Sequence, residues 1–258
     1  MIRIHRRLAW LLPVFATLAL CSSANAAPWM WSFTPYAWLV GGHTDFSVND
    51  RELASNNVTF HDMTLKVDMA AQGHFEGQNG PHGFFVDGTY VNLSTEKDHF
   101  ILGGTHGLEA RTDIKLTMLD LAGIYNPSED GRGLSVIYGA RMIYAATIAE
   151  LDFNASTDLD RRFDTNKTLW DGLLGIRYVA PITDHFSTIF RGDVSKGSTE
   201  FTWNGMLGFG YAFGDHNRYT ALAGYRYMEI NFKDRAGDAK FETKTALQGA
   251  TVGFAFRW

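Results

Sequence analysis

The chain has 258 residues, a formal net charge of −5, 14% aromatic residues, 26 glycines and a single cysteine. The mild acidity argues against nucleic acid as a partner, because nucleic-acid-binding domains carry basic surfaces. A chain with one cysteine cannot form an internal disulfide, so packing and hydrogen bonding must hold the fold. Beyond residue 26 no apolar stretch reaches the length of a membrane-spanning helix, so any membrane crossing must use strands.

The first 26 residues have the three parts of a secretory signal. A start with three arginines precedes the apolar run LAWLLPVFATLAL, and Ala24-Asn25-Ala26 fits the small-residue rule for cleavage. We therefore expect a signal peptide over 1–26 and an outer-membrane domain over 27–258, whose net charge is −8 once three arginines and no acidic residue are removed. A retained N-terminal anchor and lipid attachment at Cys21 are the weaker alternatives.

Alternation of apolar and polar residues, the periodicity of β-strands, recurs along the rest of the chain. Short turn-like connections alternate with longer polar segments, as in outer-membrane barrels, whose periplasmic turns are shorter than their external loops. Short connections are expected near Gly80, Asp130, Thr183 and Asp215, and also at 195–198, where a long loop would be due. Long polar loops are expected at about 43–62, 96–111, 152–166 and 234–242.

The segments between these connections predict ten strands. They lie at about 29–41, 63–76, 83–94, 112–126, 134–150, 167–179, 186–194, 200–213, 219–232 and 244–258. Eight strands remain possible if two segments belong to loops. The predicted fold class is all-β, a closed antiparallel up-and-down transmembrane β-barrel with both termini on the periplasmic side.

The two faces of each strand indicate which side meets lipid. In the segment 201–213, aromatic and aliphatic residues share one face, and small or polar residues such as Thr202 and Asn204 share the other. A soluble sandwich or lipocalin-like barrel would bury the apolar face and expose dense Lys and Glu. Here the polar faces instead carry isolated Arg and Asp among Gly, Ala, Ser and Thr, which fit a narrow interior. The apolar faces are therefore expected to point outward.

The isolated mid-strand charges predict a luminal charge network. A buried charge needs an opposite partner, and the planar fork of arginine suits paired sites. A structural plug is favoured over the gate of a narrow channel, because a barrel of this size leaves little room beyond its side chains. The expected members are Lys66, Asp68, Arg141, Asp171, Arg177, Arg191, Asp193 and Arg226.

Two places break the alternation. Asp120 is out of phase with Lys115, which predicts a β-bulge between them. Glu229 and Asn231 would face outward unless they lie above the bilayer.

The segment TVGFAFRW, 251–258, resembles the C-terminal signature of bacterial outer-membrane barrels, an aromatic last residue preceded by apolar residues at alternating places. This resemblance implies that Phe254, Phe256 and Trp258 form the signal that the barrel-assembly machinery recognises.

Further segments resemble a group of small proteobacterial outer-membrane barrels of unassigned function, within the broad OmpA-like barrel superfamily. They are WSFTPYAW (31–38), RGDVSKGSTEFTW (191–203), GYRY (224–227) and GFAFRW (253–258). The group usually has more glycines where Ser195 and Lys196 stand here. The resemblance implies a fold and no particular activity.

Three kinds of outer-membrane enzyme require particular residues near the outer end of the barrel. Barrel proteases use Asp–Asp and Asp–His pairs at the external rim, but Asp184-His185 and Asp215-His216 fall in short turns that we place on the periplasmic side. Lipid A deacylases and palmitoyltransferases need a His and a Ser near the outer leaflet. The predicted outer loops contain histidines and serines, but none of them lies in a recognisable catalytic motif. They are His43, His61, His99, His106, Ser47 and Ser55. No HxH or HExxH spacing indicates a metal, and no cofactor is expected.

We therefore expect a non-enzymatic outer-membrane barrel with a structural or surface-interaction role and a lumen largely plugged by Arg–Asp pairs. The alternatives, in order, are a narrow pore for small solutes, a lipid-modifying enzyme and a soluble periplasmic ligand-binding barrel. The expected partners are outer-membrane lipid, lipopolysaccharide and the barrel-assembly machinery.

Overall fold

The computed structural model describes residues 28–49, 51–58, 67–94, 98–102, 106–128, 131–153, 161–236 and 239–258. The expected signal peptide and Lys66 lie outside these ranges. Within them, no helix is long and apolar enough to cross a bilayer.

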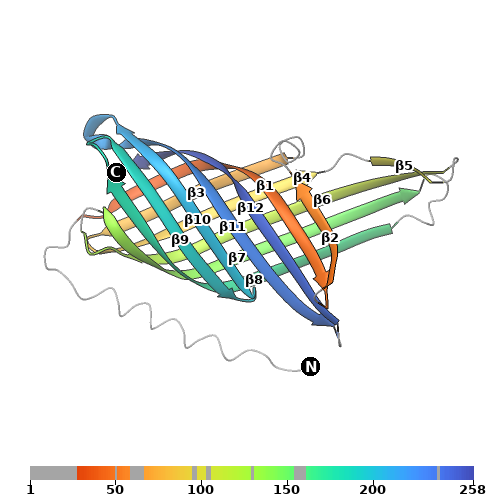
Figure 1. Cartoon of the computed structure of the whole chain (residues 1–258). Helices are drawn as coiled ribbons and strands as arrows, with labels where there is room; N and C mark the ends of the chain where they lie inside the picture. The colour runs from red at the N-terminus through yellow and green to blue at the C-terminus, as the bar shows by residue number, and fades with distance from the viewer. Residues whose placement is uncertain are drawn as a thin grey trace, which may run out of the picture.

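Ten long strands form the wall of a closed barrel (Figure 1). They are β1 (Met30–Val48), β3 (Val67–Asn79), β4 (His82–Ser94), β6 (His106–Tyr125), β7 (Gly133–Phe153), β8 (Arg161–Pro181), β9 (Phe186–Gly197), β10 (Phe201–Phe213), β11 (Tyr219–Ala236) and β12 (Ala239–Arg257). Neighbours pair antiparallel throughout, and β12 pairs with β1. The predicted ten-stranded barrel is confirmed, and the eight-stranded alternative is wrong.

The first and last strands are joined where the chain ends. The backbone N–H of Trp31 donates to the carbonyl of Trp258 at 2.9 Å, and the N–H of Trp258 donates back at 3.1 Å. Backbone groups in hydrocarbon have no water to bind, so a spanning sheet must close in this way.

The short turns lie at the same end of the barrel as the start of β1 and the end of β12. Met30 pairs with Gln78, next to the turn between β3 and β4, and the β10–β11 turn holds the 3-10 helix η2 (Asp215–Asn217). Gly80 takes a positive φ of 54° in the β3–β4 turn, a conformation that favours glycine. Bacterial barrels place their short turns and termini in the periplasm, so we assign this end to the periplasm.

The opposite, outer end contains much more strand than the sequence predicted. β1 continues to Val48, β12 begins at Ala239, and β6, β7 and β8 extend well into the segments expected to be loops. Two short strands, β2 (Arg51–Val58) and β5 (Asp98–Leu102), pair with the ends of β1 and β6. Much of the length expected to be long polar loops at this end is therefore paired strand, and the prediction of loops is wrong there. Antiparallel pairing satisfies backbone groups in water as well as in lipid, so the strands continue past the bilayer.

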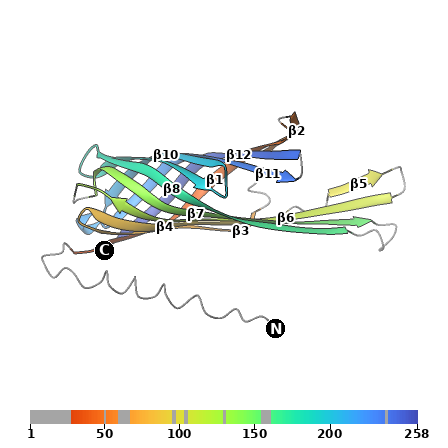
Figure 2. The same ribbon diagram turned by 90° about the horizontal axis from the view of Figure 1, so that it is seen from below.

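The outer extensions form two separate flaps (Figure 2). One contains β5 with the ends of β6, β7 and β8, and the other contains β2 with the ends of β1, β11 and β12. Between them the wall is low, because β9 and β10 are joined by the short turn 198–200. The short connection predicted there is confirmed.

Large apolar side chains face outward. Leu174 is 58% exposed and Tyr138 is 52% exposed, whereas Arg141 on the inner face of β7 is 1% exposed. Aromatic rings gather at the periplasmic end, where Trp29 stacks on Trp31 with ring centroids 5.2 Å apart. This is the orientation expected for a barrel in lipid, and the opposite of a soluble barrel.

The predicted bulge in β6 is wrong. The pairing of β6 with β4 and with β7 runs without a register shift through Lys115 and Asp120. Asp120 points inward and is buried, while Lys115 is exposed on the outer face nearer the outer end. Register shifts occur instead in β3 between Val67 and Met69, and in β1 between Phe46 and Ser47.

Candidate functional site

Two arginines and two aspartates form a closed group across the middle of the lumen, which we call the ion-pair ring. Arg141 donates from Nε to Asp120 at 2.8 Å and from Nη2 to Asp193 at 2.8 Å. Arg191 donates from Nε to Asp193 at 2.7 Å and from Nη2 to Asp120 at 2.9 Å. Each charge therefore has two opposite partners, which is what makes burial of all four tolerable.

The ring extends to a third wall of the barrel through an amide. Asn204 on β10 donates to Asp193 at 2.8 Å and accepts from Nε of Arg226 on β11 at 2.7 Å. The guanidinium of Arg226 lies over the ring of Trp38 on β1, 4.6 Å from its centroid. Side chains from β1, β6, β7, β9, β10 and β11 thus meet at one level of the lumen.

A second polar group, the histidine cluster, lies on the periplasmic side of the ion-pair ring and consists of Tyr36, His74, Glu76, Asp87 and Arg177. Nδ1 of His74 is 3.0 Å from Asp87, and Nε2 is 3.1 Å from Glu76. Both ring nitrogens face carboxylate oxygens, so both carry a proton and the imidazole is positively charged. Tyr36 donates to Asp87 at 2.9 Å, and Arg177 donates to Glu76 at 2.9 Å.

The outer half of the lumen is filled by apolar side chains, which we call the apolar seal. Its buried members are Trp38, Met118, Ile143 and Met228, and its partly buried members include Val40, Leu116, Leu169, Ile230 and Leu247. Beyond it, Nζ of Lys167 lies 3.7 Å from the ring centroid of Phe232. The sequence-based expectation of a small polar lumen is therefore wrong for this half.

The periplasmic half holds a cavity of about 760 Å³, which we call the vestibule. Its mouth is lined by residues of the short turns, including Arg132, Asp184 and Arg218. Its inner end is lined by Asp87, Arg191, Asn204 and Arg226, so it stops at the ion-pair ring. The lumen thus changes along its axis from an aqueous cavity to an ion-pair ring to an apolar seal.

The structure brings together some of the predicted luminal charges and separates others. Arg141, Arg191, Asp193 and Arg226 meet as described, and Arg177 lies in the histidine cluster. Asp171 is the cross-strand neighbour of Arg141, but no hydrogen bond or salt bridge joins it to an arginine among the described residues. It accepts hydrogen bonds from Ser195 at 3.1 Å and from the backbone N–H of Thr199 at 2.9 Å. Asp171 therefore ties the short β9–β10 turn to β8. Lys66 and the side chain of Asp68 lie outside what the structure describes.

Sequence analysis missed several partners in the lumen. Asp120 was not among the expected luminal charges, because its phase relative to Lys115 was attributed to a bulge. Met118, Asp120, Ala122 and Ile124 in fact alternate regularly and all face inward. The alternation of Phe85, Asp87 and Thr89 in β4 would have placed Asp87 inside by the same reasoning. Only the tertiary structure shows which inward residues on non-adjacent strands meet.

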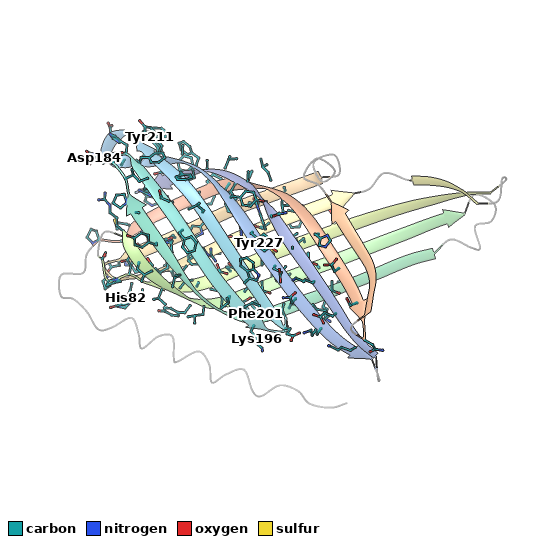
Figure 3. The ribbon with its side chains drawn as sticks, viewed as in Figure 1. His82, Asp184, Lys196, Phe201, Tyr211 and Tyr227 are labelled. Atoms are coloured by element: carbon teal, nitrogen blue, oxygen red, sulfur yellow. The ribbon has the colours of Figure 1, made fainter. Side chains whose placement is uncertain are left out.

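The Asp, His and Ser residues that could serve catalysis lie at both ends of the barrel. Asp184 and His185 lie in the β8–β9 turn, at the end marked by Asp184 and Tyr211 in Figure 3, and His216 lies in η2. At the outer end, Nε2 of His43 is 2.8 Å from Asp45. The side chains of His61, His99, His106 and Ser55 are not described. Within the described ranges, no three His, Cys, Asp or Glu side chains are placed to hold a metal ion.

The predicted C-terminal insertion signal lies on the lipid-facing side of the barrel. Phe256 and Trp258 are exposed, and Phe254 packs between Phe213 and Tyr219, with centroid distances of 5.7 and 5.9 Å. These rings belong to the periplasmic aromatic band.

Comparison with known proteins agrees with the fold. No protein-family model matches the chain, and no curated protein matches it by sequence. The outer membrane protease OmpT from Escherichia coli superimposes with a TM-score of 0.53 at 12% identity, covering 92% of this chain and 99% of that one. At this identity the likeness concerns the fold alone. Weaker matches include the translocator domain of autotransporter NalP from Neisseria meningitidis, with a TM-score of 0.43 at 14% identity over 92% of this chain and 90% of that one.

Proposed function

We propose that this protein is an integral outer-membrane barrel with a closed lumen, which acts as a structural or surface-contact protein through its outer strand flaps. The observation that carries the proposal is the double closure of the lumen. At mid-height the ion-pair ring links β6, β7 and β9, and Asn204 connects it to Arg226 on β11. The apolar seal fills the interior beyond it. An ion crossing this path would lose its hydration shell among apolar side chains, which is prohibitively costly.

The flaps support a role at the cell surface. Strands that end at the bilayer suffice for a membrane anchor, yet β6 and β7 continue 13 and 11 residues beyond the level of Leu119 and Met142. The short strands β2 and β5 add further pairing at this end. Ordered sheet presents a fixed array of side chains, which suits contact with a partner. The outward-facing apolar side chains are proposed to contact outer-membrane lipid and lipopolysaccharide. The barrel-assembly machinery is proposed to recognise Phe254, Phe256 and Trp258.

A narrow pore and an enzyme are the alternatives. The pore is disfavoured by the apolar seal, whose buried member Met228 is 0% exposed. A protease-like role is disfavoured because Asp184-His185 and Asp215-His216 lie at the periplasmic end.

Conductance in planar bilayers tests the closure. We expect no steady current from the wild-type protein, and a measurable current once the seal is opened by Trp38→Gly with Met228→Gly. The matched control is Trp170→Gly with Leu174→Gly, which removes similar volume from the lipid-facing side of β8. Steady openings in wild-type protein would contradict the proposal.

A trimmed variant tests the surface role. Deleting residues 98–110 removes β5 and its partner segment while keeping the β4–β6 pairing up to Ser94 and Asp113. In a strain lacking the protein, the full chain and the trimmed chain should restore envelope resistance to detergent equally if the role is structural. For surface contact, only the full chain should restore cell aggregation or attachment. Absence of any defect in these assays would count against both roles.

A further inference from the structure

The vestibule has an excess of positive charge that the closed-barrel function does not use. Its lining contains six arginines and three acidic side chains, and the doubly bonded His74 adds a further positive charge. We propose that the vestibule is a binding site for a small organic anion bearing a carboxylate or phosphate group, which enters from the periplasm and is held by Arg177, Arg218 and Arg257.

The arginines of the vestibule differ in how fully they are paired. Arg191 and Arg226 are engaged at the inner end by Asp120, Asp193 and Asn204. Arg218 and Arg257, in contrast, have no salt bridge within the described part of the chain. The free positive charge is therefore concentrated towards the mouth.

A single carboxylate, that of Glu76, lies near several positively charged side chains of the vestibule. Glu76 binds both Arg177 and His74, and it is also the acidic group that acts electrostatically on Arg257. Arg257 lies within electrostatic reach of Arg177 and Arg132 as well, and these like charges repel it. Nε of Arg177 is buried and has no acceptor among the described residues. A bound anion would relieve the repulsion and supply the missing acceptor for the buried Nε of Arg177, where a charge-assisted hydrogen bond is stronger than in bulk water.

The size and lining of the vestibule indicate a small organic molecule. About 760 Å³ falls within the range of small-molecule sites, which are typically hundreds of Å³. Arginine forks bind carboxylate and phosphate through paired hydrogen bonds. The wall also includes the half-buried Ile189 and Leu222, which suit an apolar or aromatic body attached to the anionic group.

The geometry restricts the ligand to one side of the membrane. The mouth is formed by Gly131, Thr183 and Asn217 of the short turns, whereas the inner end is closed by the ion-pair ring. The vestibule therefore works as a one-ended receptor site, and its occupancy does not depend on whether the outer flaps bind a partner.

Calorimetric titration of the folded protein in detergent tests the site with defined probes. Phenyl phosphate and benzoate should bind, binding should weaken as ionic strength rises, and neutral phenol should not bind measurably. Arg218→Gln combined with Arg257→Gln should weaken anion binding by about tenfold or more, because two of the three charge-assisted contacts are lost and only that of Arg177 remains. The control Lys196→Gln, at the outer end (Figure 3), should bind as wild type does. Stronger binding of phenyl phosphate would indicate a phosphate ester, and stronger binding of benzoate a carboxylate.

A second measurement uses the unaltered protein. His216 is exposed and lines the vestibule, whereas His82 is exposed in the β3–β4 turn region and does not line it. Phenyl phosphate should slow modification of His216 by diethyl pyrocarbonate, followed by mass spectrometry, without slowing that of His82. Equal binding of phenol, unchanged affinity in the double variant, or absence of His216 protection would each overturn the proposal. Because conductance is not involved, this failure is distinct from failure of the closed-barrel function.

Discussion

The periplasmic and outer halves of this barrel have the same exterior and opposite interiors. On the outside, both halves present exposed apolar side chains, such as Tyr178 towards the turns and Trp170 towards the flaps. On the inside, the periplasmic half holds an arginine-rich cavity, and the outer half is packed with Trp38, Met118 and Met228. The lipid constrains only the outer face of a strand, so the inner face is free to change from polar to apolar along the same strand.

The ion-pair ring at the boundary between the halves should be the most sensitive point. Replacing Asp193 by Ala leaves Arg141 and Arg191 short of a carboxylate in the lumen, and we expect the free energy of unfolding to fall by about 3–5 kcal/mol. Urea titration of the protein folded in lipid vesicles measures this value. Asp184→Ala, in the exposed β8–β9 turn, is the control and should change it by less than about 0.5 kcal/mol. Equal losses in the free energy of unfolding for the two variants would mean that the ion-pair ring does not stabilise the barrel.

Two methionines compare the halves directly. Met228 is 0% exposed within the apolar seal, whereas Met206 lines the vestibule. Met228→Ala should lower the free energy of unfolding by about 2–5 kcal/mol, because it leaves an empty space in a packed interior. Met206→Ala should cost clearly less, since water already reaches its neighbourhood. The same urea titration serves for both, and a larger loss for Met206→Ala would refute the contrast.

The common exterior can be tested by depth. Leu174 is 58% exposed and lies on β8 midway between Trp170 and Tyr178, the aromatic residues towards the two ends. Leu174→Arg should lower the free energy of unfolding by about 2–4 kcal/mol, the cost of a cation at the bilayer midplane. Phe201→Arg, at the outer end of β10 (Figure 3), should cost about 0–1 kcal/mol beyond the loss of the ring's own contacts. If both arginines were equally tolerated, the assignment of the outer face to lipid would fail.

Ion pairs outside the lumen should matter least. Nζ of Lys244 lies 3.2 Å from Glu229, and the lysine side chain is 50% exposed. Lys244→Ala should change the free energy of unfolding by only about 0–1 kcal/mol, because water solvates the lysine and Glu229 keeps hydrogen bonds from Tyr227 and Asn231. The effect should vanish at high salt, whereas the effect of Asp193→Ala should persist.

Sequence reasoning was strongest for strands and faces. Alternation is a local property, so the ten strands and the inward positions of Arg141, Arg177, Arg191, Asp193 and Arg226 could be predicted without a structure. It was weakest where a residue's role depends on a distant strand. Asp171 looked like a partner for arginine but holds a turn through Thr199, and Asp120 looked misplaced although it completes the ion-pair ring.

The amino-acid sequence by itself determined that this chain forms a ten-stranded barrel with its apolar face outward. Apolar and polar residues alternate with a period of two, and every backbone group in lipid must be hydrogen-bonded, which leaves no other arrangement. Only the tertiary structure decided what fills the lumen. Inward side chains from β1, β6, β7 and β11 meet through barrel closure and strand stagger, and these set the level at which the charges pair, the apolar seal packs and the vestibule ends.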